Sequence, residues 1–302
     1  MPMSLKTYLA SRQRLVDAEL RRQLPSARTR PTTIHEAMRY SIFAGGKRLR
    51  PILGLAAAEA CGAEEKSDAM ASALRLGAAV EVLHTYTLIH DDLPCMDDDD
   101  FRRGMPTCHK KFGDGIAVLA GDALLTLSFE IVAGAKTPRR YPLADFVREL
   151  ADTGGSRKLI GGQVMDLEGE GQGAKITAAQ LRFIHESKTA ALLTTAIRFG
   201  GMAANATPKQ LEALTVFGHS LGLAFQVIDD ILDVTQTSEK LGKSAGKDQA
   251  VGKATYPALF GLEKSRAEAA RLTARAREAL QVFGTRADHL REIADYLLNR
   301  DY

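Results

Sequence analysis

The chain has 302 residues, with 40 Lys and Arg against 37 Asp and Glu, which gives a net charge of +3 at neutral pH. The 45% hydrophobic and 25% charged residues are ordinary for a globular protein and exclude a disordered or fibrous chain. Acidic and basic residues are scattered along the whole length, so the chain lacks the concentrated basic surface typical of nucleic-acid-binding proteins.

Three cysteines, Cys61, Cys95 and Cys108, form no CxxC pair. An odd number without a paired spacing indicates reduced thiols and a cytoplasmic location rather than a disulfide framework. The N-terminal 24 residues mix charged with apolar side chains, which predicts an amphipathic helix rather than a signal peptide.

Apolar residues recur at spacings of three and four through most of the chain, Trp is absent, and β-branched alternation is rare. The pattern predicts an all-α fold. Turn-forming residues predict breaks between helices at 24–31, 61–68, 97–115, 135–142, 169–177 and 236–254. None of these resembles an interdomain linker, so we expect one domain over residues 1–302.

Two segments, 74–90 and 216–228, are apolar on nearly every helical face and are expected to lie at the centre of the fold. The apolar stretches near 115–135 and 216–228 are either broken by Asp122 and Glu130 or too short to cross a bilayer. We therefore expect no transmembrane segment.

The segment 91–100 reads DDLPCMDDDD and places six carboxylates directly after an apolar helix. Pro94 disfavours helix at the residue before it, so Asp91 and Asp92 are expected at a helix end, with Asp97 returning from a short loop. Negative charges at a helix C-terminus oppose the helix dipole, and a bound cation would relieve the repulsion.

A second acidic motif, DDILD, follows the apolar residues FQVI and contains Asp229, Asp230 and Asp233. A spacing of four places Asp229 and Asp233 on one helical face, a like-charge pair that costs about 0.2–0.5 kcal/mol in an isolated helix. One such motif is more typical of a solvated helix end. Two of them, each ending an apolar helix, favour a shared polyvalent ligand.

Carboxylate oxygens with few neighbouring His or Cys residues suit Mg²⁺, which binds through one or two carboxylates and substrate phosphates. Zinc is disfavoured by the same composition. An EF-hand calcium loop is excluded, because counting from Asp97 the sixth residue is Arg102 instead of Gly and the twelfth is Cys108 instead of Glu.

Cations suited to an anionic substrate occur in GGKRLRP, which contains Lys47, Arg48 and Arg50, and in FRRG, which contains Arg102 and Arg103. Arg binds phosphate oxygens bidentately, and Lys supplies a compact charge. Taken singly, each is more typical of a solvated surface. The Gly- and Lys-rich segment 236–254 is a candidate lid over bound phosphate.

Six motifs occur in the order found in trans-isoprenyl diphosphate synthases, namely GGKRLRP, HDDLPCMDDDDFRRGMPTCHKKFG, GGQVMDL, SKTAALL, FQVIDDILD and LGKSAGKDQAVGKATYP. Over about residues 40–260 the chain resembles that family, nearest to the bacterial-type farnesyl diphosphate synthases, with geranylgeranyl diphosphate synthases a near second. The resemblance implies a helical bundle of the isoprenoid synthase type around a large central cavity.

The resemblance also implies a reaction: Mg²⁺-dependent, head-to-tail condensation of isopentenyl diphosphate with dimethylallyl or geranyl diphosphate, giving farnesyl diphosphate and releasing diphosphate. Geranylgeranyl diphosphate synthesis is the alternative. Metal and cation charge would stabilise the departing diphosphate, and the alkene of isopentenyl diphosphate would attack the allylic cation. A dry apolar cavity would protect that cation from water. In the family the departing diphosphate accepts the proton, so no protein base is assigned.

The family's functional residues map onto matching positions of this chain. Three Mg²⁺ ions are implied at Asp91, Asp92, Asp97 and Asp229, with Asp233 a further candidate. Contacts to the allylic diphosphate are implied at Arg102, Lys188 and Lys243, and contacts to isopentenyl diphosphate at Lys47, Arg50, His84 and Arg103. Thr189 and Gln226 resemble the polar groups near the family's carbocation.

Residues five and four positions before Asp91 are Tyr86 and Thr87, about one helical turn deeper along the expected cavity wall. A bulky Tyr86 is expected to limit chain growth, and the family pattern places the product at C15. The alternative interpretation is that Tyr86 is simply packed in the core.

Other interpretations remain open. His84 and His90 are each compatible with a buried structural histidine, and the role of Gln163 in GGQ is ambiguous. A terpene cyclase also uses DDxxD but needs no second diphosphate site. His90 followed by Asp91 matches the HD dipeptide of metallophosphohydrolases, yet leaves DDILD unexplained. A non-catalytic regulatory subunit would be expected to lack the second motif. Large uncharged helical faces indicate a homodimer, as in the family.

Overall fold

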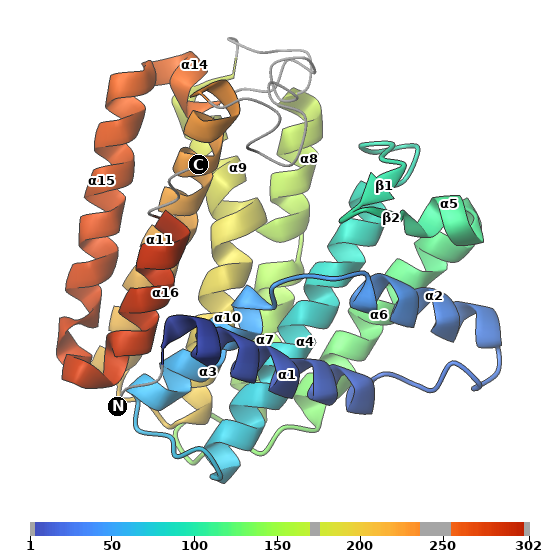
Figure 1. Ribbon diagram of the computed structural model, residues 1–302, viewed down its shortest axis with the longest axis horizontal. Helices are drawn as coiled ribbons and strands as arrows, with labels where there is room; N and C mark the ends of the chain where they lie inside the picture. The colour runs from blue at the N-terminus through green and yellow to red at the C-terminus, as the bar shows by residue number, and fades with distance from the viewer. Residues whose placement is uncertain (1–3, 170–175, 236–254, 299–302) are drawn as a thin grey trace.

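The computed structural model describes residues 4–169, 176–235 and 255–298, which form a bundle of helices (Figure 1). In chain order the elements are α1 (Leu5–Gln23), α2 (Thr32–Phe43), α3 (Leu49–Ala60), α4 (Asp68–Asp91), β1 (Phe101–Arg102), β2 (Met105–Pro106), α5 (Cys108–Phe112), α6 (Asp114–Ala133), α7 (Leu143–Gly154), α8 (Leu159–Gly169), α9 (Ala178–Ile184), the π-helix η2 (His185–Ala190), α10 (Ala191–Ala203), α11 (Pro208–Thr235), α14 (Tyr256–Phe260), α15 (Leu262–Ala279), the 3₁₀-helix η3 (Leu280–Ala287) and α16 (Asp288–Leu298). The predicted all-α fold is confirmed, and the single-domain prediction for residues 1–302 stays a prediction.

Serine side chains cap the N-termini of two helices. The side chain of Ser4 accepts a hydrogen bond from the backbone of Thr7 (3.3 Å) at the start of α1, and Ser67 caps α4 in the same way (3.2 Å to the Met70 nitrogen). The predicted breaks at 24–31 and 61–68 separate α1 from α2 and α3 from α4. The break at 97–115 also contains the antiparallel hairpin of β1 and β2, which the all-α prediction did not include.

A further break between α2 and α3 was not predicted. It falls in the GG of GGKRLRP, where Gly45 and Gly46 have φ of 97° and 127°. Residues with a Cβ rarely adopt these angles, so the glycine pair ends the helix here.

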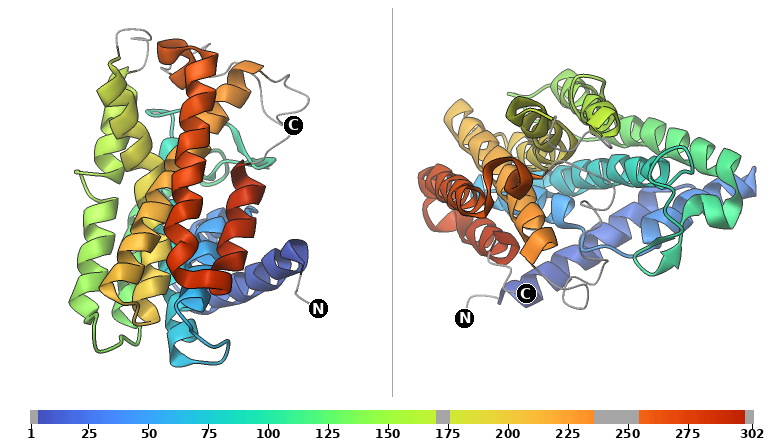
Figure 2. Two further views of the ribbon diagram at one scale, coloured as in Figure 1. Left: turned by 90° about the vertical axis from the view of Figure 1, so that its left-hand side faces the viewer. Right: turned by 90° about the horizontal axis from the view of Figure 1, so that it is seen from above.

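Buried apolar residues form two clusters. The first surrounds α4 and draws on α1, α2, α6, α7 and α10, and the second surrounds α11 and draws on α3, α10, α15 and α16. Both α3 and α10 contribute to each cluster, since Leu55 and Leu192 belong to the first while Ile52 and Leu193 belong to the second. The α3 and α10 pair therefore forms the shared wall. The helices around α11 run roughly alongside one another, and α1 lies across their lower part (Figure 2).

Two helices, α6 and α11, are long and apolar enough by length and composition to cross a membrane. Both belong to the bundle: α6 packs on α4, and α11 packs on α10 and α15. Such helices also occur in the cores of soluble proteins. The expectation of no transmembrane segment therefore stays a prediction.

The shared wall depends on a close approach of two backbones. A Cβ built on Gly200 would lie 1.8 Å from the carbonyl oxygen of Gly54, and one on Gly54 would lie 2.7 Å from the carbonyl oxygen of Ala196. Interiors are packed too densely to absorb such an overlap without a backbone shift. Glycine at both positions therefore sets the spacing between α3 and α10.

Gly200→Ala is expected to lower the free energy of unfolding by about 1–3 kcal/mol or more, because the added methyl group forces α3 and α10 apart. Urea unfolding followed by circular dichroism measures this. The matched control is Gly115→Ala in α6, where a Cβ meets nothing within 4 Å; it should be neutral or stabilise by up to about 1 kcal/mol. Equal effects of the two substitutions would contradict the close-approach argument.

Candidate active site

The two acidic motifs lie at the C-terminal ends of two long helices. Both α4 and α11 run toward the upper part of Figure 1, where α4 ends beside β1 and α11 ends beside α14. Asp91 is the last residue of α4 and Asp92 its C-cap. The backbone N–H of Asp97 donates to the carbonyl of Asp91 (2.9 Å), so the chain folds back after Pro94. The predicted helix end and the predicted return of Asp97 are confirmed.

The Asp91 carboxyl group is largely shielded from solvent. Burial raises its pKa to about 6; the positive charge of Lys188 opposes this shift and the negative charge of Asp97 reinforces it. A carboxylate in this setting is stabilised by any cation brought next to it. The electrostatics are therefore those expected of a metal or cation ligand.

Asp92 has a protein partner. Its carboxylate, 3% exposed, accepts two hydrogen bonds from Nε of Arg102 (2.8 and 2.9 Å) and one from Nη2 (2.5 Å). Arg102 also lies 3.9 Å from Asp99. This bidentate pair connects the β1 strand to the end of α4. The metal role of Asp92 and the diphosphate role of Arg102 stay predictions, and in this structure the two side chains bind each other.

Arg103 lies over the glycine loop between α2 and α3. Its Nη1 donates to the carbonyl of Gly45, and a Cβ on Gly46 would lie 2.5 Å from that same nitrogen. Gly46 therefore serves two requirements, a positive φ and room for a guanidinium group. The contact brings together the GGKRLRP and FRRG motifs, which are far apart in the sequence.

His84 lies in a strongly cationic environment. Burial lowers its pKa well below the ordinary value, and the charges of Arg50, Arg103, Arg102 and Arg48 lower it further, so the imidazole is neutral. Burial lowers the pKa of Arg50, and the charge of nearby Arg103 lowers it further against the opposing effect of Glu81. The structure thus groups four of the five residues predicted to bind substrate. The fifth, Lys47, places its Nζ 3.4 Å from the hydroxyl of Tyr296 in α16.

The SKTAALL motif begins in the π-helical turn η2. Such turns are rare and are frequently found at functional sites. In this turn the Nζ of Lys188 lies 2.7 Å from Oδ2 of Asp166 in α8. Thr189 follows it and lines the same cavity.

The second acidic motif occupies the last two turns of α11, with Asp229 half-buried and Asp230 buried. Oδ2 of Asp230 accepts a hydrogen bond from the backbone of Tyr256 (2.9 Å) and lies 3.7 Å from Nε2 of His185. His185 is also within electrostatic reach of Asp229 and Asp166. Through His185 the second motif is therefore connected to the Lys188–Asp166 pair.

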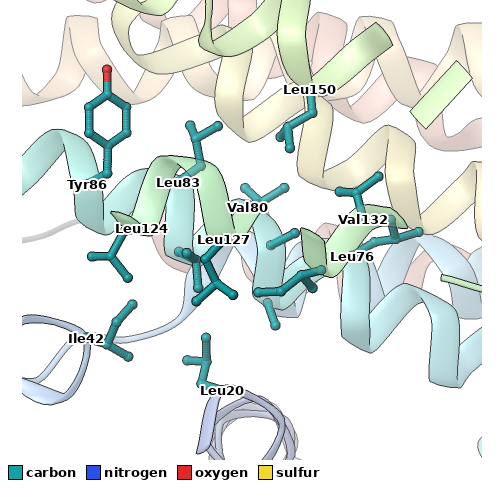
Figure 3. Packing of buried hydrophobic residues seen from close by; sticks show 14 of the residues in the cluster. Leu20, Ile42, Leu76, Val80, Leu83, Tyr86, Leu124, Leu127, Val132 and Leu150 are labelled. Carbon is teal, nitrogen blue, oxygen red and sulfur yellow. The ribbon is translucent and has the colours of Figure 1, made fainter. Parts of the chain in front are cut away.

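A cavity of about 490 Å³ opens between α4, α8, η2 and α10. Among its lining residues are Arg50, His84, Tyr86, Thr87, Asp91, Gln163, Lys188 and Thr189, together with His90 and the apolar side chains of Val118, Leu159, Ile160, Val164 and Leu192. Tyr86 is 7% exposed and projects from α4 on the side away from Leu124, Ile42 and Leu20 (Figure 3). Seven predicted site residues thus share one apolar cavity.

Other predicted residues lie elsewhere. Among the described residues, the lining does not include Lys47, Asp92, Asp97, Arg102, Arg103, Gln226 and Asp229. Lys243 lies outside the described residues, as does the predicted lid. A second hollow of about 910 Å³, between α7, α10 and α11, has walls of mixed charge and contains no described member of the predicted set.

The carboxylates at the end of α4 fit Mg²⁺, because Asp91 in the cavity wall and Asp97 close to it both offer hard oxygen ligands. The structure also brings together Asp98, Asp100 and His109, whose ligand atoms lie within 4.8 Å of one another. Asp100 is paired with Lys110 (2.7 Å). None of these three was predicted to hold metal.

Sequence reasoning missed several partners of the predicted residues. Asp166 stood in the quoted GGQVMDL motif but had no assigned role, Glu81 lies one turn before His84 on α4, and Tyr296 is distant in sequence from Lys47. Asp166 is the only charged residue in GGQVMDL, and this isolated carboxylate was a sign that the residue has a role in the site. No local pattern identifies Glu81 or Tyr296.

Buried His185 makes stability depend on pH. Burial lowers its pKa from 6.5 to about 4, so the unfolded chain takes up a proton below pH 6.5 while the folded protein does not. Stability is therefore lost as the pH falls from 6.5 toward 4. Between pH 6.5 and 4.5, wild type should lose about 2 kcal/mol more than His185→Gln in urea unfolding. Parallel losses in the two proteins would contradict this assignment.

Comparison with known proteins agrees with this geometry. The polyprenyl synthetase family matches residues 31–294. A geranylgeranyl pyrophosphate synthase of Capsicum annuum is 50% identical over 90% of this chain and 72% of the relative. The geranylgeranyl diphosphate synthase of Cyanophora paradoxa is 43% identical over 99% of this chain and 97% of its own.

Solved structures give the same result. An FPP/GFPP synthase of Zymomonas mobilis superposes with a TM-score of 0.81 at 35% identity, covering 97% of this chain and 98% of its own. A geranyltransferase of Legionella pneumophila has a TM-score of 0.84 at 30% identity over 98% of both chains. This chain belongs to the polyprenyl synthetase family and is a trans-prenyltransferase that condenses prenyl diphosphates.

Proposed function

We propose that the enzyme condenses isopentenyl diphosphate head to tail with dimethylallyl and then geranyl diphosphate, giving farnesyl diphosphate. The observation that carries the proposal is one apolar cavity lined by Asp91 and Lys188 and also by Arg50 and His84. Two charged groups in one cavity suit two diphosphates, and the apolar side chains of the same cavity suit their hydrocarbon chains.

Two different sets of residues are proposed to bind the two substrates. Lys188, Arg102 and the aspartates of both motifs orient the allylic diphosphate, and Arg50, Arg103 and Lys47 bind the diphosphate of isopentenyl diphosphate. His84, held neutral by burial and four arginines, donates or accepts a hydrogen bond without adding charge. Bound Mg²⁺, as three ions, would supply Lewis-acid neutralisation of the leaving group.

The bond changes follow from this placement. The allylic C–O bond breaks and the electron pair leaves with diphosphate; the alkene then forms the new C–C bond, and the resulting cation loses a proton to the departing diphosphate. Thr189 and Gln226 are proposed to stabilise the allylic cation through oxygen dipoles. The apolar lining, including Leu159, Ile160 and Leu192, excludes water that would quench the cation.

Activity should require both isopentenyl diphosphate and Mg²⁺. Incubation with geranyl or dimethylallyl diphosphate, followed by dephosphorylation and chromatography, should yield prenyl alcohols only when both are present. Asp91→Asn and Asp229→Asn should each reduce kcat/KM by at least about 100-fold, because the leaving group loses a metal ligand. Asp114→Asn, an exposed aspartate at the start of α6, is the matched control and should retain activity.

The same assay separates the other classes. Release of diphosphate without isopentenyl diphosphate would indicate a terpene cyclase, and release of inorganic phosphate would indicate a phosphohydrolase. A protein that folds and binds substrate but turns over nothing would be a non-catalytic subunit. Each of these outcomes would contradict the proposed condensation.

Product length rests on Tyr86, whose buried ring lines the cavity about one turn before Asp91. A bulky side chain there supports a C15 product. The second candidate is C20, which is favoured by the names of the geranylgeranyl synthases of Capsicum annuum and Cyanophora paradoxa.

Tyr86→Ala should shift the product distribution from C15 to C20 or longer, because the truncated side chain leaves space for the growing chain. The measurement is chromatography of the dephosphorylated products at fixed substrate ratio. Tyr86→Phe keeps the bulk and should leave the distribution unchanged. If Tyr86→Ala makes the same products as wild type, Tyr86 does not set product length.

A homodimer is proposed through the outer face of α6. Val118 and Leu119 are 40% and 54% exposed on this apolar helix, whose other side packs on α4, and Val118 also lies at the edge of the cavity. A second copy of the same chain would cover both residues. An Arabidopsis thaliana relative, 46% identical, is named a large subunit of a heterodimeric synthase, which supports assembly into a dimer. A cytoplasmic location is likewise proposed, supported by three free cysteines.

A further inference from the structure

Arg48 lies at the junction of three helices. Its Nε donates to Oδ1 of Asp17 in α1 (2.9 Å), its Nη1 to Oε1 of Glu81 in α4 (3.0 Å), and its Nη2 to the carbonyl of Ile42 at the end of α2 (2.7 Å). Arg48 and Glu81 are 4% and 3% exposed. Each of the three guanidinium nitrogens thus donates one hydrogen bond in the interior, and Arg48 does not line the cavity.

The backbone at Arg48 is left-handed. Arg48 has φ 52° and forms the N-cap of α3, directly after Gly45 and Gly46 with φ of 97° and 127°. Arginine has no intrinsic preference for this region, and its side chain does not cap the helix. The hydrogen bonds of the guanidinium group therefore hold a conformation that the local sequence disfavours.

This conformation sets the positions of substrate-binding cations on both sides. Lys47 precedes Arg48 in the loop, and Arg50 follows it in the first turn of α3 and reaches the cavity. The Nε of Arg50 is buried and has no hydrogen-bond partner among the described residues. Because Arg50 also lines the cavity, an anion bound there would meet a desolvated guanidinium group that still has a donor unpartnered in the described part of the chain.

Glu81 supplies the opposing charge in this region. Its negative charge partly offsets the lowering of the pKa values of Arg50 and Arg103, two cations that otherwise repel each other. A buried ion pair of this kind adds little net stability, since desolvation consumes most of the Coulomb attraction. A conformational role accounts for its presence better than a purely stabilising one.

We propose that the buried Arg48–Glu81 pair is a positioning device for the isopentenyl diphosphate pocket: it fixes the loop between α2 and α3 so that Arg50, Lys47 and Arg103 are arranged before substrate binds. The inference rests on the proposed function of that pocket. Arg48 and Glu81 act through these cations and do not touch the reacting atoms.

The test replaces the pair with apolar residues of similar volume, Arg48→Met with Glu81→Met, which avoids leaving an unpaired buried charge. Titration calorimetry should show the Kd for isopentenyl diphosphate raised about tenfold or more, because misplaced cations lose part of their contacts. The KM for geranyl diphosphate and the kcat at saturation should stay within about twofold of wild type.

The control is a second arginine–glutamate pair, Arg12 with Glu59, whose Nη2 and Oε1 atoms lie 2.7 Å apart and which also joins α1 to the core. It does not line the cavity. Arg12→Met with Glu59→Met should leave the Kd for isopentenyl diphosphate unchanged. An equal weakening in the control variant would show a general loosening of the bundle and overturn the inference.

Arg48→Lys provides a second measurement, because it keeps the charge but lacks the forked donors that bridge Glu81 and Ile42. It should fold and should also weaken isopentenyl diphosphate binding without raising the KM for geranyl diphosphate. The positioning inference is overturned if either Arg48 variant leaves the Kd for isopentenyl diphosphate unchanged, or if binding of both diphosphates weakens equally. Neither result contradicts the proposed function. Failure of wild type to consume isopentenyl diphosphate contradicts the proposed function instead.

Discussion

Repulsion among carboxylates gathered at the ends of apolar helices is the constraint on which the rest of the site depends. The end of α4 carries Asp91 and Asp92, and the returning loop adds Asp97 beside them. Burial raises the pKa of Asp91 to about 6, so its charged form is stabilised only by cations that the fold brings near it. Lys188 is one such cation, and divalent metal with diphosphate would supply the rest.

The protein pairs buried or half-buried charges between segments that lie 10 to 33 residues apart in the sequence. Arg102 neutralises Asp92 from the hairpin, Lys188 faces Asp166 from the π-helical turn, and Arg48 meets Glu81 in the interior. Each pair joins a hairpin, turn or loop to a helix. Charges that would be costly if buried alone are in this way paired inside the fold.

The cavity lies next to a closely packed part of the bundle, the contact between α3 and α10. Glycines let α3 and α10 approach until their backbones touch at Gly54 and Gly200, which separates the two apolar clusters by one shared wall. The cavity lies beside that wall, between α4, α8 and α10, where Tyr86 and the aliphatic side chains meet the charged mouth. One space therefore has both apolar and charged lining, as a substrate with a charged head and a hydrocarbon tail requires.

The sequence by itself determined the helical class, the ends of α1 and α3, and the position of Asp91 at a helix end, because these follow from periodicity and from Pro94. Its ordered motifs also contained four of the predicted site residues that line the cavity, namely Arg50, Asp91, Lys188 and Thr189. Tertiary structure alone decided which charges pair. Arg102 bonds to Asp92, and Glu81 binds Arg48, because side-chain partners depend on distances between helices that no local period encodes. The left-handed backbone conformation of Arg48 could not be predicted from the sequence either, since it depends on contacts between packed helices.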